Sequence, residues 1–595
     1  MKRLLSLILV LLLLLAGCQK SDGDAPDAGD VEVPESGEAL QPDFQQDEKD
    51  MFTGDDQQTD FDKKNSTVIT LTGKTATCDD KTVGISGGTV TISAAGTYVL
   101  SGTLNDGAVV VNAGKKDDVH IVLNGVSITS QTAAPLCAVS ADKVIVTLAD
   151  KTENTLIAGS SFAAVAGNTI DAAVYSKQDL TLNGGGKLTV DAPAGHGISC
   201  KDNLIITGGT YVITSSAHGL DANDSIRMAD STVTVASGKD GIHAENTTDT
   251  TKGFVYIASG TFDVDAAGDG ISAGAYLQIE DGTFDMVTGG GSENAEQHTS
   301  DNWGQPGGGM PGMRPGRRTA TVTTVAATTE DSTSIKGLKA AGGLLVNGGT
   351  LVMDCADDAL HSDTSLTVNG GTFTIETGDD AFHAEEALTI TAGTIKVSES
   401  YEGLEGLHIV VTGGDISLVA DDDGLNAAGG NDQSGTGGFR GDQFGGPPGG
   451  MGGSSNGSVI ISGGKLYVQA SGDGIDANGT LSITGGDVTV CGPTQGDTAT
   501  LDFDASATIS GGTFIGTGAS GMAQTFSKTE QGILSLRVGN QSAGTQIVLK
   551  DGDKTLVSYA PKLNFAVVII STPDMKSGET YTLQIGSYTE TMTAE

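Results

Sequence analysis

Two recurring positions along this chain gather most of the residue types that could bind a metal ion. The first position is acidic and precedes a small residue; it holds Asp240, Asp269, Asp358, Asp380, Glu402, Asp423 and Asp473, doubled in places by Asp357, Asp379 or Asp422. The second position lies two residues after the small one and holds His243, His361, His383, Glu405, Asn426 and Asp476. Carboxylate oxygens are the ligands that Ca²⁺ prefers, and neutral imidazole binds transition metals.

The spacing of these positions predicts the fold that must align them. The small residues Ala359 and Ala381 lie 22 positions apart, and the same interval recurs along the chain. Within one interval the apolar residues alternate in three short groups, at 366–368, 373–375 and 382–384. Alternation predicts strands with one face inward, so the chain is expected to be all-β, a single-stranded parallel β-helix with about 22 residues per coil. A leucine-rich repeat is the competing solenoid, but its asparagine and second leucine positions are absent.

Stacked coils would place equivalent acids about 5 Å apart. Two like charges at that distance repel by about 3 to 4 kcal/mol at an effective dielectric of about 20, so the file needs a countercharge. Lys336 and Lys339 stand only at its upstream end, and a hard cation suits oxygen ligands, so we predict bound Ca²⁺. The predicted ligands are Asp357, Asp358, Asp379, Asp380, Glu402, Glu405, Asp422, Asp423 and Asp473.

Two other interpretations of these positions stay open. The aspartates could only accept N–H bonds within their turns, as Asp often does before Gly. The histidines could form a solvated outward face. Zinc is disfavoured because the histidines occur one per coil and lack cysteine partners.

The N-terminus predicts export and anchoring. Lys2 and Arg3 precede an apolar run at 4–15 that is too short for an ordinary spanning helix. The run ends in Leu-Ala-Gly-Cys, the pattern of a bacterial lipoprotein signal, so Cys18 is the expected lipidated residue. We therefore expect a protein exported and lipid-anchored to the outer face of the cell membrane, at the cell surface. An ordinary secretory signal with an incidental cysteine is the alternative.

Composition divides the rest of the chain. We predict a signal peptide at 1–17, an acidic flexible tether at 18–62, a β-helix at 63–520 with Gly-rich insertions at 289–334 and 429–457, and a small antiparallel β cap at 521–595.

The net charge of −43 excludes simple electrostatic attraction to nucleic acid or anionic lipid. The remaining cysteines form no visible disulfide framework or zinc site; they are Cys78, Cys137, Cys200, Cys355 and Cys491.

A run of ordered phrases gives the chain a family resemblance. These phrases lie at Lys336–Ala340, Asp357–Ser362, Asp379–Ala384, Ser400–Gly406 and Asp421–Gly430. The chain resembles the clostridial β-helix proteins that bind cellulose and polygalacturonic acid, contain calcium and are secreted or lipid-anchored. The likeness covers roughly residues 71–520.

The resemblance implies a carbohydrate-binding protein with calcium at the acidic turns. The expected partner is a plant-type polysaccharide, polygalacturonate or cellulose, with the membrane reached only through the lipid anchor, no nucleic acid, and a monomeric chain. Binding polygalacturonate to so acidic a protein would require bridging calcium or the loop cations. The predicted sugar-contacting residues are His361, His383, Asn426, Asp476 and Trp303.

A binding role competes with two others, because a fold does not settle a function. A polysaccharide lyase or hydrolase could use Asp357, Asp358 and His361, with Lys336 or Lys339 as base. The same acidic phrase recurs in several coils, whereas an active site is normally singular, so we predict a binding protein and not an enzyme. A structural surface adhesin or spacer is the third possibility.

Overall fold

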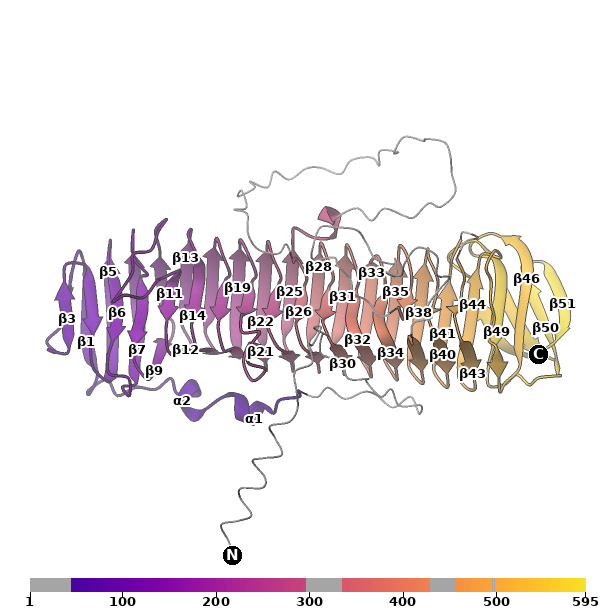
Figure 1. Cartoon of the computed structure of the whole chain (residues 1–595), viewed down its shortest axis with the longest axis horizontal. Coiled ribbons are helices and arrows are strands. Elements are labelled where there is room, and N and C mark those ends of the chain that lie inside the picture. The colour runs from indigo at the N-terminus through magenta and orange to yellow at the C-terminus, as the bar shows by residue number, and fades with distance from the viewer. Residues whose placement is uncertain (1–43, 296–333, 429–455, 495, 497) are drawn as a thin grey trace, which may run out of the picture. The chain divides into compact units, whose positions relative to one another are not determined.

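Parallel strands build almost all of the molecule. The structure, a computed structural model, describes residues 44–295, 334–428, 456–494, 496 and 498–595. Strands make up 54% of the chain and helices are nearly absent, which confirms the all-β prediction. One sheet of 47 strands is paired mostly in parallel, as in a β-helix (Figure 1).

A repeating group of three strands pairs with its copy further along the chain. Strands β29 (Leu360–Ser362) and β30 (Ser365–Val368) both pair with β32 (Phe382–Ile390), and β31 (Thr372–Thr377) pairs with β33 (Thr394–Glu399). The aligned partners include Leu360 with Phe382, Leu366 with Leu388 and Phe373 with Ile395. Like apolar residues therefore stack on each other in a continuous core.

The strands that carry the second recurring position form one ladder. In chain order they are β14 (His196–Cys200), β17 (Leu220–Ala222), β20 (Ile242–Ala244), β23 (Ile271–Ala273), β26 (Leu338–Ala340), β29, β32, β34 (Leu404–Val411), β36 (Leu425–Asn426), β39 (Asp476–Ala477) and β42 (Asp502–Phe503). Their first core residues, among them Leu360, Phe382 and Leu404, are fully buried. Because side chains alternate along a strand, the residue after each one points away from the core.

Close packing explains why a small residue follows each acid. A Cβ atom on Gly241 would lie 2.4 Å from Val264 Cγ1 and 2.6 Å from the carbonyl oxygen of Gly270. At Gly424 it would lie 2.1 Å from Val468 Cγ1 and 2.6 Å from the Gly474 oxygen. The turn therefore admits little beyond Gly or Ala, and this keeps the residue before it, most often an acid, at the same place in each coil.

Within the predicted flexible tether at 18–62, the described residues 44–62 are packed in part on the strands. Helices α1 (Glu48–Met51) and α2 (Gly54–Gln57) lie along the strands (Figure 1). Asp56 is fully buried, and its Oδ1 accepts bonds of 2.6 Å from both Lys143 Nζ and Thr181 Oγ1. Met51 packs in a cluster with Tyr256. Acidic composition suggested solvation, but one buried ion pair and a few apolar anchors hold this part against the coils.

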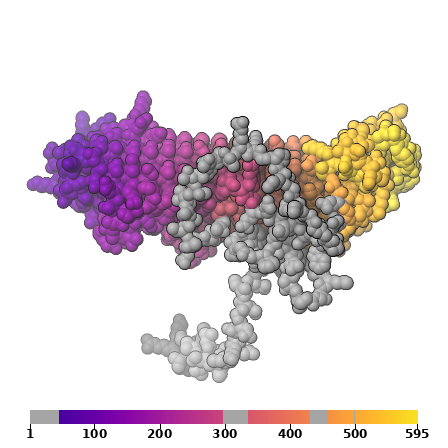
Figure 2. All heavy atoms as spheres, turned by 90° about the horizontal axis from the view of Figure 1, so that it is seen from above, coloured from indigo at the N-terminus to yellow at the C-terminus, as the bar shows by residue number. Residues whose placement is uncertain are grey.

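Antiparallel strands follow the last coil. Strand β49 (Phe565–Ser571) pairs with both β44 (Thr513–Gly518) and β46 (Ile533–Gln541), and a separate four-stranded sheet contains β48 (Lys554–Tyr559), β47 (Ile547–Asp551), β50 (Thr580–Ile585) and β51 (Tyr588–Thr593). Figure 2 shows this part in yellow at one end of the coils. Its role as a cap stays a prediction.

The five cysteines in the described part of the chain are all free; they are Cys78, Cys137, Cys200, Cys355 and Cys491. Among the residues that the structure describes, no helix has the length and apolar character needed to span a membrane. Cys18, Trp303 and most of both Gly-rich insertions lie outside those residues.

Candidate functional site

Two parallel files of side chains run along one edge of the coils, and together they are called the site face. File A is the residue before each small residue; its members are His196, His218, Asp240, Asp269, Lys336, Asp358, Asp380, Glu402, Asp423 and Asp473. File B is defined by strand register; its members are Asp221, His243, Ser272, Lys339, His361, His383, Glu405, Asn426, Asp476 and Asp502. The structure thus brings together acids that are far apart in the sequence.

One oxygen of most file A carboxylates holds the backbone of the next coil. Asp358 Oδ1 accepts the N–H of Asp380 at 3.1 Å, and Asp380 Oδ1 accepts that of Glu402 at 3.2 Å. Asp423 Oδ1 accepts the N–H of Asp473 in the same way. The turn role that the sequence left open is therefore present, and it leaves one carboxylate oxygen of each aspartate for another partner.

In the middle of the site face, the second oxygen of Asp358 already has a lysine and a histidine partner. Asp358 Oδ2 lies 2.6 Å from Lys336 Nζ and 2.8 Å from His361 Nδ1, and Asp357 Oδ1 lies 3.1 Å from the same Lys336 nitrogen. Burial favours the neutral acid, but the Lys336 ammonium and His361 outweigh it and hold the pKa of Asp358 well below its usual range. Asp379 lies beside this group. Lys336 supplies here the charge that the sequence argument gave to calcium.

Two histidines of file B, His361 and His383, are buried, so the alternative of a solvated outward face does not hold for them. Their side chains are 7% and 0% exposed. Their rings stack with centroids 4.7 Å apart, because the coil spacing places one imidazole on the next. Burial opposes a charge on His383, but Glu405 Oε2 at 2.6 Å and Asp380 Oδ2 at 3.1 Å outweigh it and raise its pKa.

Beyond His383 the face is acidic and incompletely paired. Glu402 Oε1 accepts a bond of 3.0 Å from Asn426 Nδ2, whereas Glu402 Oε2 and Asn426 Oδ1 are buried without a hydrogen-bond partner among the described residues. The largest charge effects on Asp423 come from Asp473, Asp422 and Asp476, which are all acidic.

The pKa values of these acids record that crowding. Burial first, and then neighbouring carboxylates, raise the pKa of Glu402 and Asp423 well above their usual values. Burial and acidic neighbours likewise raise the pKa of Asp473 to about 7 and that of Asp476 to about 6. Asp422 additionally accepts a hydrogen bond from the Tyr401 hydroxyl. A buried, oxygen-rich cluster of this kind suits a hard divalent cation.

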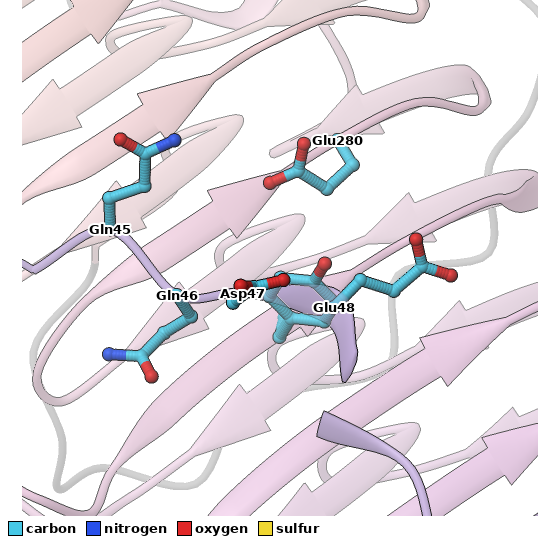
Figure 3. Close-up of a pocket in the computed structure, with 6 residues that line it drawn as sticks. Gln45, Gln46, Asp47, Glu48 and Glu280 are labelled. Atoms are coloured by element: carbon cyan, nitrogen blue, oxygen red, sulfur yellow. The ribbon is translucent and has the colours of Figure 1, made fainter. Parts of the chain in front are cut away.

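Sequence reasoning missed two features. His196, His218 and Asp221 belong to the same two files. Their positions were the available signal: His196 and His218 directly precede Gly197 and Gly219, and Asp221 lies two residues after Gly219. A polar hollow also lies between the N-terminal segment and strands β21 (Phe254–Ile257) and β24 (Leu277–Ile279); it is lined by Gln45, Gln46, Asp47, Glu48, Tyr256 and Glu280 (Figure 3). No local motif marks this hollow, because it exists only once the N-terminal segment packs on the strands.

A solenoid with a charged edge of stacked side chains defines the class of protein, and comparison with known proteins defines the family. Residues 86–381 and 380–558 match the family described as "Carbohydrate-binding domain-containing protein", and the chain belongs to it. A relative of the same description from Acetivibrio thermocellus is 40% identical over 126 residues, which are 21% of this chain and 44% of the relative. The chain thus spans less than half the length of that relative.

One solved structure is also similar in sequence. It is titled "Structure of the polysaccharide lyase-like protein from C. thermocellum, Gadolinium derivative". The match has 33% identity and a TM-score of 0.36, and it covers 37% of this chain and 89% of that one.

Proposed function

We propose that this chain binds a pectin-type or cellulosic polysaccharide at the cell surface through calcium held on the downstream site face. The downstream site face comprises Asp380, Glu402, Glu405, Asp423, Asn426, Asp473 and Asp476. The observation that carries the proposal is the set of buried oxygens there with no partner among the described residues, Glu402 Oε2 and Asn426 Oδ1, beside unneutralised carboxylates.

The donor set favours calcium over other ions. Carboxylate and amide oxygens predominate, and Ca²⁺ accepts six to eight such ligands in flexible geometry. His383 is the one basic side chain in contact with these carboxylates among the described residues, and its Nδ1 is engaged by Asp380 and Glu405. The predicted ligands Asp357 and Asp358 are weaker candidates than the downstream acids, since Lys336 already pairs with both.

Charge explains why the ion would matter for the polymer. A chain of net charge −43 repels polygalacturonate at long range. A cation shared between protein and polymer carboxylates reverses that repulsion locally. Of the residues that we predicted to contact sugar, Asn426 and Asp476 lie partly exposed on this face, whereas His361 and His383 are buried and would act only by positioning neighbouring acids. Anchoring through Cys18 would hold this surface outside the cell.

The structure works against the lyase alternative in its proposed form. A base must be uncharged to remove a proton, whereas Lys336 Nζ donates to two carboxylates and is 4% exposed. Lys339 Nζ donates to Ser334 at 2.9 Å and lies 3.8 Å from Asp269. Both amines are therefore already engaged by side chains of the protein.

Affinity electrophoresis of the purified full chain in gels containing polygalacturonate or soluble cellulose derivatives tests the proposal. We expect retardation in calcium and its loss in excess chelator. Glu402→Gln should weaken retardation, whereas Asp263→Asn, which removes an exposed acid on another strand, should not. Undiminished retardation in chelator would overturn the calcium-bridging model, and failure to bind any polymer would favour the spacer.

A further inference from the structure

Three histidines from successive coils stack at the upstream end of the site face. His196 begins β14, His218 precedes β17 and His243 lies in β20. The ring centroids of His196 and His218 are 5.1 Å apart with planes inclined by 13°, and those of His218 and His243 are 4.3 Å apart with planes inclined by 18°. Residues that are one per coil in the sequence therefore become direct neighbours.

Two carboxylates complete the group. Asp221 Oδ1 lies 3.3 Å from His243 Nδ1, and Asp240 Oδ2 lies 3.2 Å from His218 Nδ1. The nitrogen and oxygen atoms form two overlapping triads, each with ligand atoms within 4.8 Å of one another: His196, His218 and Asp221, and His218, Asp240 and His243. Each triad combines two imidazoles with one carboxylate, a donor set that binds Zn²⁺ and related ions.

The backbone N–H of Asp240 donates to His218 Nδ1 at 3.2 Å, so Nε2 is the ring nitrogen of His218 that is open to a metal ion, and the other contacts leave the remaining donors available. Ser199 Oγ and Lys201 Nζ engage Asp221 Oδ2, at 2.8 and 3.3 Å, so Asp221 Oδ1 faces the imidazoles. His196 Nδ1 is buried without a partner among the described residues. The side chains of His218 and His243 are 13% and 23% exposed, so an ion can reach the group from solvent.

We propose that this histidine group is a second metal site, selective for a divalent transition-metal ion of the zinc type. Imidazole nitrogens suit such ions, whereas calcium prefers the oxygens of the downstream site face. Since both triads share His218, one ion binds per chain. Stacking brings histidines that occur one per coil into direct contact, so their spacing along the sequence does not disfavour zinc.

Cobalt is a suitable probe because Co²⁺ in a low-coordinate nitrogen and oxygen site absorbs visible light. The full chain, without an affinity tag and in excess Ca²⁺, is titrated with CoCl₂ and then with ZnCl₂. We expect one equivalent of Co²⁺ to produce an absorption band that Zn²⁺ abolishes. His218→Ala should weaken Co²⁺ binding by about 100-fold or more, because the loss of a ligand exceeds the loss of an outer-shell partner.

Matched variants locate the ion. His408→Ala removes a histidine that bonds to Ser458 outside the group and should leave the titration unchanged. His196→Gln and His243→Asn provide milder changes if His218→Ala fails to fold, and each should weaken binding at least about tenfold. A band that survives all three substitutions, or that His361→Ala abolishes instead, would overturn the proposal.

Discussion

The upstream and downstream parts of the site face share one backbone and differ in how their acids are neutralised. Upstream, Asp221, Asp240 and Asp358 each contact a histidine or lysine side chain. Downstream of His383, Glu402 and Asp423 have chiefly acidic neighbours. Stacking forces equivalent side chains together in both parts, so the acids of each coil need a cation from within the chain, a cation from solution, or a proton. The difference shows that a repeated acidic motif does not by itself define a metal site.

Removing the internal cation should have the largest effect and make the upstream part resemble the downstream one. Lys336→Met leaves Asp357 and Asp358 buried without their ammonium, which should cost about 3 to 5 kcal/mol in the free energy of unfolding. Urea denaturation in chelator measures this loss. Added Ca²⁺ should restore stability to the variant more than to the parent chain. Lys396→Met, at an exposed position of β33, is the control. An unchanged midpoint for Lys336→Met would show that this pair is not needed.

The pH dependence of stability should separate the two parts. The pKa values of Asp473 and Asp476, about 7 and about 6 in the folded chain, exceed the ordinary value of 3.8. A carboxyl whose pKa is raised by folding favours the folded state when protonated, so this contribution is complete below about pH 4 and fades as pH rises to about 7. Upstream acids with lowered pKa values, such as Asp358, are already ionised throughout that window. In chelator the melting temperature should therefore fall between about pH 4 and about pH 7.

Calcium should flatten that profile, because a bound cation neutralises the ionised carboxylates. The shift in melting temperature on adding Ca²⁺ should accordingly be larger at pH 8 than at pH 5. Differential scanning fluorimetry across this range measures both curves. A calcium-induced shift that does not grow with pH would contradict the assignment of the ion to the downstream acids.

A single downstream substitution should act in opposite directions with and without calcium. Glu402→Gln replaces a buried carboxyl among crowded carboxylates with a neutral amide and gives Asn426 Oδ1 a possible donor, so in chelator it should stabilise the fold by about 1 kcal/mol. In Ca²⁺ the same change should reduce the stabilising shift. Asp358→Asn, upstream, should destabilise the fold in both conditions, since it leaves Lys336 without its closest partner. Equal effects of the two substitutions would remove the distinction between the parts.

The strand periodicity could be predicted because alternation and turn glycines are local properties of the sequence. The small residue at Gly241 or Gly424 reflects close packing against the next coil, and its regular spacing aligned the acids. Which acid finds which partner could not be predicted in the same way. Lys336 reaches Asp358 across one coil, and only the three-dimensional register shows that their atoms meet at 2.6 Å.

The histidines and the N-terminal segment show the limits of reasoning from composition. His196 and His218 occupy the acid position of their coils but were not recognised, because the pattern was defined by charge instead of by register. Asp56 lies in a stretch that composition marks as solvated, yet Lys143, distant in sequence, buries it in an ion pair. Contacts between remote segments decided both cases.

A crystal structure of the chain grown in saturating Ca²⁺ would show whether the downstream site face holds calcium. We predict an ion bound by Glu402 Oε2 and Asn426 Oδ1 at calcium–oxygen distances of about 2.3 to 2.6 Å, with Asp423 in its coordination sphere or next to it. Downstream carboxylates without an ion, or an ion in place of the Lys336 ammonium, would contradict it.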